Sequence, residues 1–316
     1  MARDSSRRRK RRVSGGLAQP PWRDIVNPYK PIEVLSEEQV ERIHAASLTA
    51  LEDLGMEILG DEALDVLARA GADVDRETRR VRFDRGLIEE SIAQAPSEFT
   101  LHARSPARNV TLGPAHVNFT PVSSAANCSD LERGRRPGTY TDFCDFLRIA
   151  QSLNIMHFIA GYPVEALDLP VPTRHLDCYY GFATLTDRVW RTYALSRDRC
   201  ADGIEMACIA RGVSREQLAK EPGLLTMINT NSPLRLDGPM SEGLMEMARA
   251  GQAVSITPFT LAGAMSPVTL AGALTQQNAE ALAALAFTQI VNPGTPVLYG
   301  GFTSNVDMKT GAPAFG

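Results

Sequence analysis

Aromatic, amide and hydroxyl side chains recur where several apolar segments of the chain end, with few charged residues among them. Aromatic faces attract quaternary ammonium ions at roughly 0.5–2 kcal/mol per contact, and a nearby carboxylate can supply a counter-charge. These residue types indicate a site for a cationic amine, although aromatic rings that simply fill the mouth of a fold give the same pattern, and the pattern alone favours that explanation. The candidate substrate-binding residues are Tyr162, Tyr193, Asn229, Asn231, Thr257, Phe259, Tyr299, Phe302 and Asp307.

The sequence lacks the usual motifs of several other kinds of chemistry. The sequence contains no G-x-x-x-x-G-K-[ST] phosphate loop, no dinucleotide fingerprint and no H-E-x-x-H. Its five histidines are scattered, and none of its five cysteines is spaced as C-x-x-C, so we predict buried thiols and no metal site. Lys309 is the one lysine near the end of an apolar segment. It is either a surface residue paired with Asp307 or the Schiff-base lysine of a different barrel enzyme. No catalytic residue is assigned.

Short apolar segments that alternate with helical patterns must position the candidate residues. We expect strands over Met156 to Tyr162, Val189 to Leu195, Leu224 to Asn229, Ala253 to Thr257 and Pro296 to Tyr299. A strand over Val117 to Phe119 would open the series and bring it to about six. Near-continuous apolar strands are typical of parallel sheets covered on both faces, with the site at their carboxyl ends. A closed (β/α)8 barrel needs more strands, over roughly 250 residues, so these segments form either an open α/β sheet or an incomplete barrel.

The rest of the chain divides by composition into two further parts. We predict a disordered basic leader at 1–27, because Arg7 to Arg12 are all basic and no apolar run follows them. An α+β elaboration follows at 28–115, and the partial barrel spans 116–316. The formal net charge of −4 argues against a nucleic-acid partner, and no apolar run reaches the roughly 18 residues of a membrane helix.

Three long motifs resemble the trimethylamine:corrinoid methyltransferase family. They are Asn229-Thr-Asn-Ser-Pro-Leu-Arg-Leu-Asp-Gly-Pro-Met240, Thr257-Pro-Phe-Thr-Leu-Ala-Gly-Ala-Met-Ser-Pro-Val-Thr-Leu-Ala-Gly272, and Val291-Asn-Pro-Gly-Thr-Pro-Val-Leu-Tyr-Gly-Gly301 continuing to Asp307-Met-Lys-Thr-Gly-Ala312. Gly55-Met56-Glu57 after a long helix also fits, so the likeness covers nearly the whole chain.

The resemblance implies a TIM-type barrel that moves a methyl group from a methylated amine, such as trimethylamine or glycine betaine, to Co(I). The cobalt belongs to a corrinoid carried by a partner protein, so the chain itself would bind no cofactor. It also implies a cytoplasmic homo-oligomer of one-carbon metabolism, as in methanogenesis, without a membrane partner. The bacterial type without pyrrolysine fits this chain.

The chain departs from the family in its length, because family members are longer and complete the barrel. It therefore resembles the N-terminal portion of such an enzyme. Two alternatives remain: a non-catalytic truncated fragment of such an enzyme, and a different TIM-barrel enzyme that uses Lys309.

Overall fold

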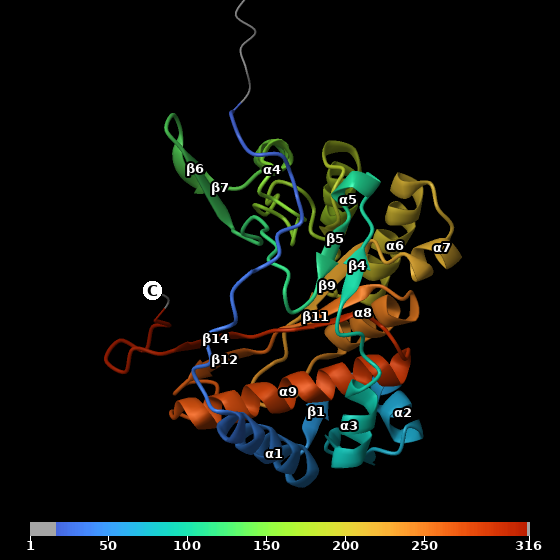
Figure 1. Cartoon of the computed structure of the whole chain (residues 1–316), viewed down its shortest axis with the longest axis vertical. Coiled ribbons are helices and arrows are strands. Elements are labelled where there is room, and N and C mark those ends of the chain that lie inside the picture. Colours follow the sequence, from blue (N-terminus) through green and yellow to red (C-terminus); the bar gives the residue numbers. More distant parts are fainter. Residues whose placement is uncertain (1–16, 315–316) are drawn as a thin grey trace, which may run out of the picture.

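The computed structural model describes residues 17–314, and its centre is a four-stranded sheet in the order β13-β11-β9-β8 (Figure 1). Every pairing in this sheet is parallel. Ile159 extends the arrangement by a single parallel bridge to Trp190. The strands are β8 (Trp190–Arg191), β9 (Leu224–Ile228), β11 (Ala253–Ile256) and β13 (Val297–Tyr299). The predicted α/β class with a parallel sheet is confirmed.

The expected strand over Val117 to Phe119 is wrong. His116 bridges antiparallel to Val26, and the N–H of Val117 donates to the carbonyl of Ile25 at 2.8 Å. The segment therefore pairs with the chain that precedes the first helix instead of joining the parallel sheet. Across residues 17–314 we find several short sheets and no closed barrel. The basic run Arg7 to Arg12 lies outside the described residues.

Helices follow the parallel strands and pack on one side of the sheet (Figure 1). Side chains of strand β9 show how the sheet divides two cores: Leu224 and Ile228 lie in the main core, while Leu225 lies in a smaller second core. This alternation follows from strand geometry, because successive side chains point to opposite faces. The helices are α4 (Tyr140–Ser152), α5 (Arg174–Leu185), α6 (Arg197–Arg211), α7 (Arg215–Lys220), α8 (Gly238–Arg249) and α9 (Leu270–Val291).

A short antiparallel hairpin closes the second core. It consists of β4 (Phe99–Leu101) and β5 (Val110–Leu112), joined through the 3-10 turn η1 (Pro106–Arg108). Leu101 and Val110 of the hairpin are fully buried, and they pack with Val189 and Leu225 of the sheet. The face of the sheet opposite the helices is thus covered by apolar side chains from the N-terminal third.

The N-terminal elements pack against α9 and not against the parallel sheet (Figure 1). They are α1 (Glu37–Asp53), β1 (Met56–Ile58), α2 (Asp61–Arg69), β2 (Asp73–Asp75), β3 (Arg80–Arg82) and α3 (Arg85–Ile92). The small strand β10 (Arg235–Leu236) pairs in parallel with β1 and ties the two regions together. α9 is covered by α1 and α3 on one side and by α8 on the other, and its sequence is apolar around most of its circumference, as is usual for a buried helix. Among the described helices, none is long and apolar enough to cross a membrane.

Two strand pairs of the structure were not expected from the sequence. β12 (Phe259–Ala262) and β14 (Phe302–Asn305) directly follow β11 and β13 and pair in parallel, so the strand-end segments continue the direction of the sheet. β6 (Asn127–Asp130) and β7 (Gly134–Pro137) form a hairpin that projects beside α4 (Figure 1).

The five cysteines are free and buried, as the sequence predicts.

Candidate functional site

Two of the candidate tyrosines lie in contact at the carboxyl ends of neighbouring parallel segments. The ring centroids of Tyr162 and Tyr193 are 4.2 Å apart. The Tyr193 hydroxyl accepts the Tyr162 N–H at 2.8 Å and forms a second hydrogen bond with the Ser124 hydroxyl at 3.0 Å. Burial raises the pKa of both phenols. The pair is therefore a neutral, buried aromatic cluster held in place by hydrogen bonds.

A cation lies against this aromatic pair. The guanidinium carbon of Arg191 is 4.4 Å from the centroid of the Tyr193 ring, a cation–π distance. Arg191 ends strand β8 and is 8% exposed. The sequence analysis missed it because the segment Val189 to Leu195 was interpreted only as an apolar strand. A single arginine inside such a segment is the signal that could have found it.

Asn229 and Thr257 form a second contact at the strand ends. The Asn229 amide donates to the Thr257 carbonyl at 2.8 Å and to its hydroxyl at 3.0 Å. Gly300 follows β13 beside them, and a β-carbon added to it would lie 2.9 Å from Cγ2 of Thr257. A glycine at this position thus lets the neighbouring strand ends approach closely. The structure brings these two predicted residues together.

Phe259 and Phe302 stack on the β12–β14 extension. Their ring centroids are 5.0 Å apart and the rings are nearly parallel, at 19°. The pairing of the two strands sets this contact, since Phe259 is opposite Phe302 in the register. The Phe302 ring is half exposed. These two predicted residues form an aromatic surface separate from the Tyr162–Tyr193 pair.

Tyr299 points toward the helices. Its hydroxyl donates to the Asn278 side chain of α9 at 2.7 Å. It lines an open groove of about 270 Å³ between α1 and α9, together with Leu35, Val40, Ile43, His44, Leu274 and Gln277. The structure does not place Tyr299 with the other candidate tyrosines.

Asn231 and Asp307 serve local turns. The Asn231 side chain accepts the N–H of Asp237, the residue that caps α8, at 3.0 Å. One Asp307 carboxylate oxygen accepts the N–H groups of Lys309 and Thr310 at 2.8 and 3.0 Å. These backbone hydrogen bonds hold the pKa of Asp307 below its usual range. The structure does not bring either residue to the tyrosine pair.

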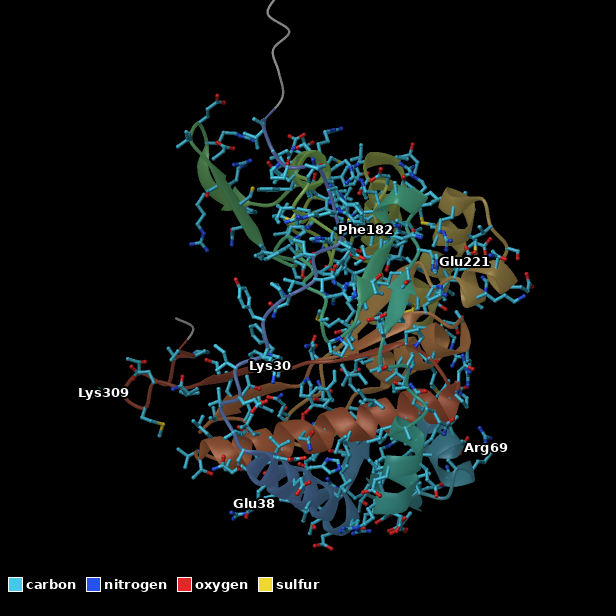
Figure 2. All side chains as sticks on the ribbon, in the orientation of Figure 1. Lys30, Glu38, Arg69, Phe182, Glu221 and Lys309 are labelled. Carbon is cyan, nitrogen blue, oxygen red and sulfur yellow. The ribbon has the colours of Figure 1, made fainter. Side chains whose placement is uncertain are left out.

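Lys309 is exposed at the outer end of the segment that carries β14, away from Phe182 of α5 (Figure 2). Its backbone N–H contacts Asp307, and the expected pairing of its ammonium with that carboxylate is not formed in the described structure. A Schiff-base lysine needs a dry pocket. An exposed position gives this lysine no such environment.

The sequence analysis also missed Glu280, which is fully buried in α9. Its carboxylate holds the loop that follows β9: it accepts hydrogen bonds from the Ser232 hydroxyl at 2.7 Å, the Leu234 N–H at 2.9 Å and the Thr230 hydroxyl. The Gln276 amide donates to it at 3.0 Å. It is the only charged residue between Leu270 and Val291, which is a signal the sequence offered. Across the part of the chain that the structure describes, no group of three or more His, Cys, Asp or Glu side chains could hold a metal ion.

Comparison with known proteins identifies the family. A family model described as trimethylamine methyltransferase (MTTB) matches residues 2–316. The chain belongs to this family. A glycine betaine methyltransferase from Desulfitobacterium hafniense (strain Y51) is 37% identical over 283 residues, which cover 90% of this chain and 58% of the relative. The family predicted from the three motifs is confirmed.

Other relatives differ in the methyl donor that their names give. The trimethylamine methyltransferase MttB of Desulfitobacterium hafniense (strain DSM 10664 / DCB-2) is 30% identical over 289 residues, covering 89% of this chain and 58% of the relative. A proline betaine:corrinoid methyltransferase from Eubacterium limosum is 25% identical over 302 residues, covering 89% and 59%. The chain thus spans less than two thirds of the length of these members of the trimethylamine methyltransferase family.

Proposed function

We propose that this chain takes part in methyl transfer from a methylated amine, such as trimethylamine or glycine betaine, to the Co(I) of a corrinoid on a partner protein. The observation that carries the proposal is the family match over residues 2–316. Relatives named glycine betaine methyltransferase, trimethylamine methyltransferase and proline betaine:corrinoid methyltransferase support it. The corrinoid is then a substrate held by the partner, and the chain binds no cofactor itself.

The chemistry fits the residues at the strand ends. Co(I) attacks the N-methyl carbon of an ammonium, the C–N bond breaks, and the electron pair stays on nitrogen, which leaves as a neutral amine. The methyl group ends on cobalt, which is oxidised to Co(III). No side chain needs to transfer a proton. The protein must hold the methyl group in line and exclude water, and the Tyr162–Tyr193 pair with Asn229 and Thr257 provides aromatic faces and an oriented amide for that task.

We propose that the parallel sheet is part of a (β/α)8 barrel. The sequential β8, β9, β11 and β13, each followed or preceded by helices, support a barrel wall. In the described residues β13 pairs only with β11, so further strands are needed for closure. We retain 1–27 as a leader, 28–115 as an α+β elaboration and 116–316 as the partial barrel. The chain would act as a cytoplasmic homo-oligomer in one-carbon metabolism.

Methyl transfer can be measured directly. The protein is mixed with a corrinoid protein reduced to Co(I) and with trimethylamine, glycine betaine or proline betaine in turn, and methyl-Co(III) formation is followed by its absorbance. We expect formation with at least one amine. The proposed function is wrong if no amine gives methyl-Co(III), also when the protein is supplied with the C-terminal segment that its longer relatives have in addition.

A non-catalytic fragment is the second candidate, favoured by one observation: the outer edge of β13 has no partner strand among residues 17–314. An unpaired edge tends to associate with other chains. Self-association in size-exclusion chromatography, together with no methyl transfer, would support the fragment. A monodisperse protein with a cooperative thermal transition would argue against it.

A further inference from the structure

Arg191 is a buried cation with few acceptors around it. Arg191 is 8% exposed and lies at the end of β8, the edge strand of the four-stranded parallel sheet. A guanidinium carries five N–H donors, yet within the described residues the Arg191 guanidinium makes one hydrogen bond, to the carbonyl of Ala160 at 3.2 Å. Its Nε is buried and has no acceptor among the described residues. The guanidinium also forms no ion pair in that part of the chain, although burying a charge without a partner is unfavourable.

A second buried arginine three residues earlier shows the contrast. Arg188 donates to the side chain and carbonyl of Gln151 at 3.3 and 3.1 Å, and to the carbonyl of Leu153 at 2.9 Å. Those bonds fasten β8 to the end of α4, so Arg188 has a structural role. Arg191 has no comparable set of acceptors, and its burial is not explained by the fold around it.

Glu165 attracts Arg191, but the two side chains form no ion pair among the described residues. Glu165 pairs with Arg174, whose nitrogen lies 3.9 Å from its carboxylate. Burial raises the pKa of Glu165, against the attraction of Arg174 and Arg191. Arg174 itself has a buried Nε without an acceptor in the described structure. The region beside the tyrosine pair therefore holds more positive than negative charge.

The aromatic contact leaves the N–H groups of Arg191 available. Tyr193 attracts the guanidinium through its ring face, but this contact accepts no N–H hydrogen bond. Carboxylates accept two parallel hydrogen bonds from a guanidinium, which matches an arginine with open donors. The tyrosine pair lies against the same guanidinium, and aromatic rings attract quaternary ammonium ions. One small molecule that carries both charges would satisfy both features.

We infer that Arg191 binds the carboxylate of the methyl donor, so that the donor is a betaine, a quaternary ammonium joined to a carboxylate, and not trimethylamine. The inference rests on the proposed function and narrows its substrate class. A trimethylammonium ion carries only positive charge and would be repelled by the buried guanidinium. A betaine brings the anion that Arg191 lacks and keeps its ammonium beside the aromatic rings.

Calorimetric titration with three methylated ammonium compounds tests the inference: glycine betaine, choline chloride and trimethylammonium chloride. Choline has the same trimethylammonium group with a hydroxyl in place of the carboxylate. The unmodified chain should bind glycine betaine more tightly than choline by roughly 10–100-fold, the range of a charged hydrogen-bonded pair. Arg191→Gln should remove that preference, because it weakens glycine betaine binding and no longer repels choline. Arg215→Gln, which alters an exposed ion pair on α7, should preserve it.

The results separate the inference from its alternatives. Equal binding of choline and glycine betaine, no binding of glycine betaine, or an unchanged preference in Arg191→Gln would overturn it. If the missing carboxylate is instead a protein side chain supplied by another segment or a second copy, Arg191→Gln would lower the melting temperature or disrupt association without changing ligand preference, and that also overturns it. Arg191→Lys keeps the positive charge and should retain part of the preference for glycine betaine. This variant controls for a loss of binding that comes from misfolding in Arg191→Gln. Methyl transfer from trimethylamine but not from glycine betaine would refute this inference and leave the proposed function standing, whereas no transfer from any amine would refute the proposed function.

Discussion

The Glu280 carboxylate in α9 accepts a hydrogen bond from the Ser232 hydroxyl, 2.7 Å away in the loop after β9. The same carboxylate accepts from Leu234 and Thr230, so one buried side chain fixes a whole strand-end loop. Asn229 and Asn231 border that loop. Thr230 and Glu280 are 50 residues apart in the sequence. The position of the proposed site therefore depends on a helix that comes much later in the chain.

Glu280→Gln should destabilise the protein. The amide has only one accepting oxygen, so its NH2 group would face hydroxyl or N–H donors that the carboxylate now satisfies. We expect a loss of about 2–4 kcal/mol in the free energy of unfolding, because buried donors would be left unpaired. Urea unfolding followed by circular dichroism measures this loss. Glu38→Gln, at an exposed position on α1 (Figure 2), is the control and should change stability by less than about 0.5 kcal/mol. Equal stability of the two variants would contradict the assigned role of Glu280.

Gly243 lets α8 approach the end of the β8 segment. A β-carbon at this position would lie 2.7 Å from Cα of Ala194, a backbone contact that cannot move aside cheaply. Gly243→Ala should therefore cost about 1–3 kcal/mol through overpacking. Gly238→Ala, in the same helix, is a matched control, since its nearest neighbour would be 3.8 Å away. That variant should be neutral or slightly stabilising. Thermal melts of both proteins distinguish the effects, and a Gly243→Ala protein as stable as the control would refute the close approach.

Tyr193→Phe removes the hydroxyl and keeps the ring that faces Arg191. The Tyr162 N–H and the Ser124 hydroxyl then lose their partner. We expect destabilisation of about 1–3 kcal/mol from the unpaired buried N–H, and slower methyl transfer if the tyrosine pair orients the donor. Tyr180→Phe changes an exposed tyrosine of α5, 61% accessible, and should alter neither quantity. Denaturant unfolding and the methyl-Co(III) assay check both expectations. Unaltered stability in Tyr193→Phe would show that the hydroxyl contacts are dispensable.

Local patterns predicted much of the fold because their causes are local. The capping box of Ser36 and Gln39, which starts α1, is a pattern within four residues of the sequence, and apolar runs predicted the segments of β9 and β11. Val117 to Phe119 has the same apolar character, but its partner is the chain near Ile25, which no local pattern could reveal. The pairing of β12 with β14 likewise depends on strand ends that meet only in the folded sheet.

The candidate site was predicted in part for a related reason. Residues that follow neighbouring parallel strands lie at the same edge of the sheet. This rule correctly placed Tyr162 beside Tyr193 and Asn229 beside Thr257. The direction of each side chain was not available from that rule, so Tyr299, which points to α9, could not be told from Tyr193. Glu280 and Arg191 were missed because each is a single charged residue inside an apolar segment.

Asp142 should make the stability of the protein depend on pH below about 4, near the ordinary pKa of an aspartate. Its side chain is 5% exposed and pairs with Arg136 of the β6–β7 hairpin, while its other oxygen accepts from Thr139, the cap of α4. Burial alone would raise the pKa of Asp142, but hydrogen bonds from Thr139 and Arg136 outweigh it and hold the pKa below its usual range.

The direction of this pH dependence follows from the linkage between proton binding and folding. A carboxylate whose pKa is lowered in the folded state stabilises the fold above its unfolded pKa, and that contribution disappears as the pH falls through the folded pKa. Asp142→Asn should therefore unfold more easily than the unmodified chain at about pH 7, by about 1–3 kcal/mol, and the difference should shrink as the pH is lowered below about 4. Asp145→Asn is the control on the same helix, because that residue is 56% exposed in an ion pair with Arg148. Urea unfolding at several pH values measures both. A stability difference for Asp142→Asn that stays constant down to strongly acidic pH would mean that the carboxylate of Asp142 is not held in its charged form by Arg136 and Thr139.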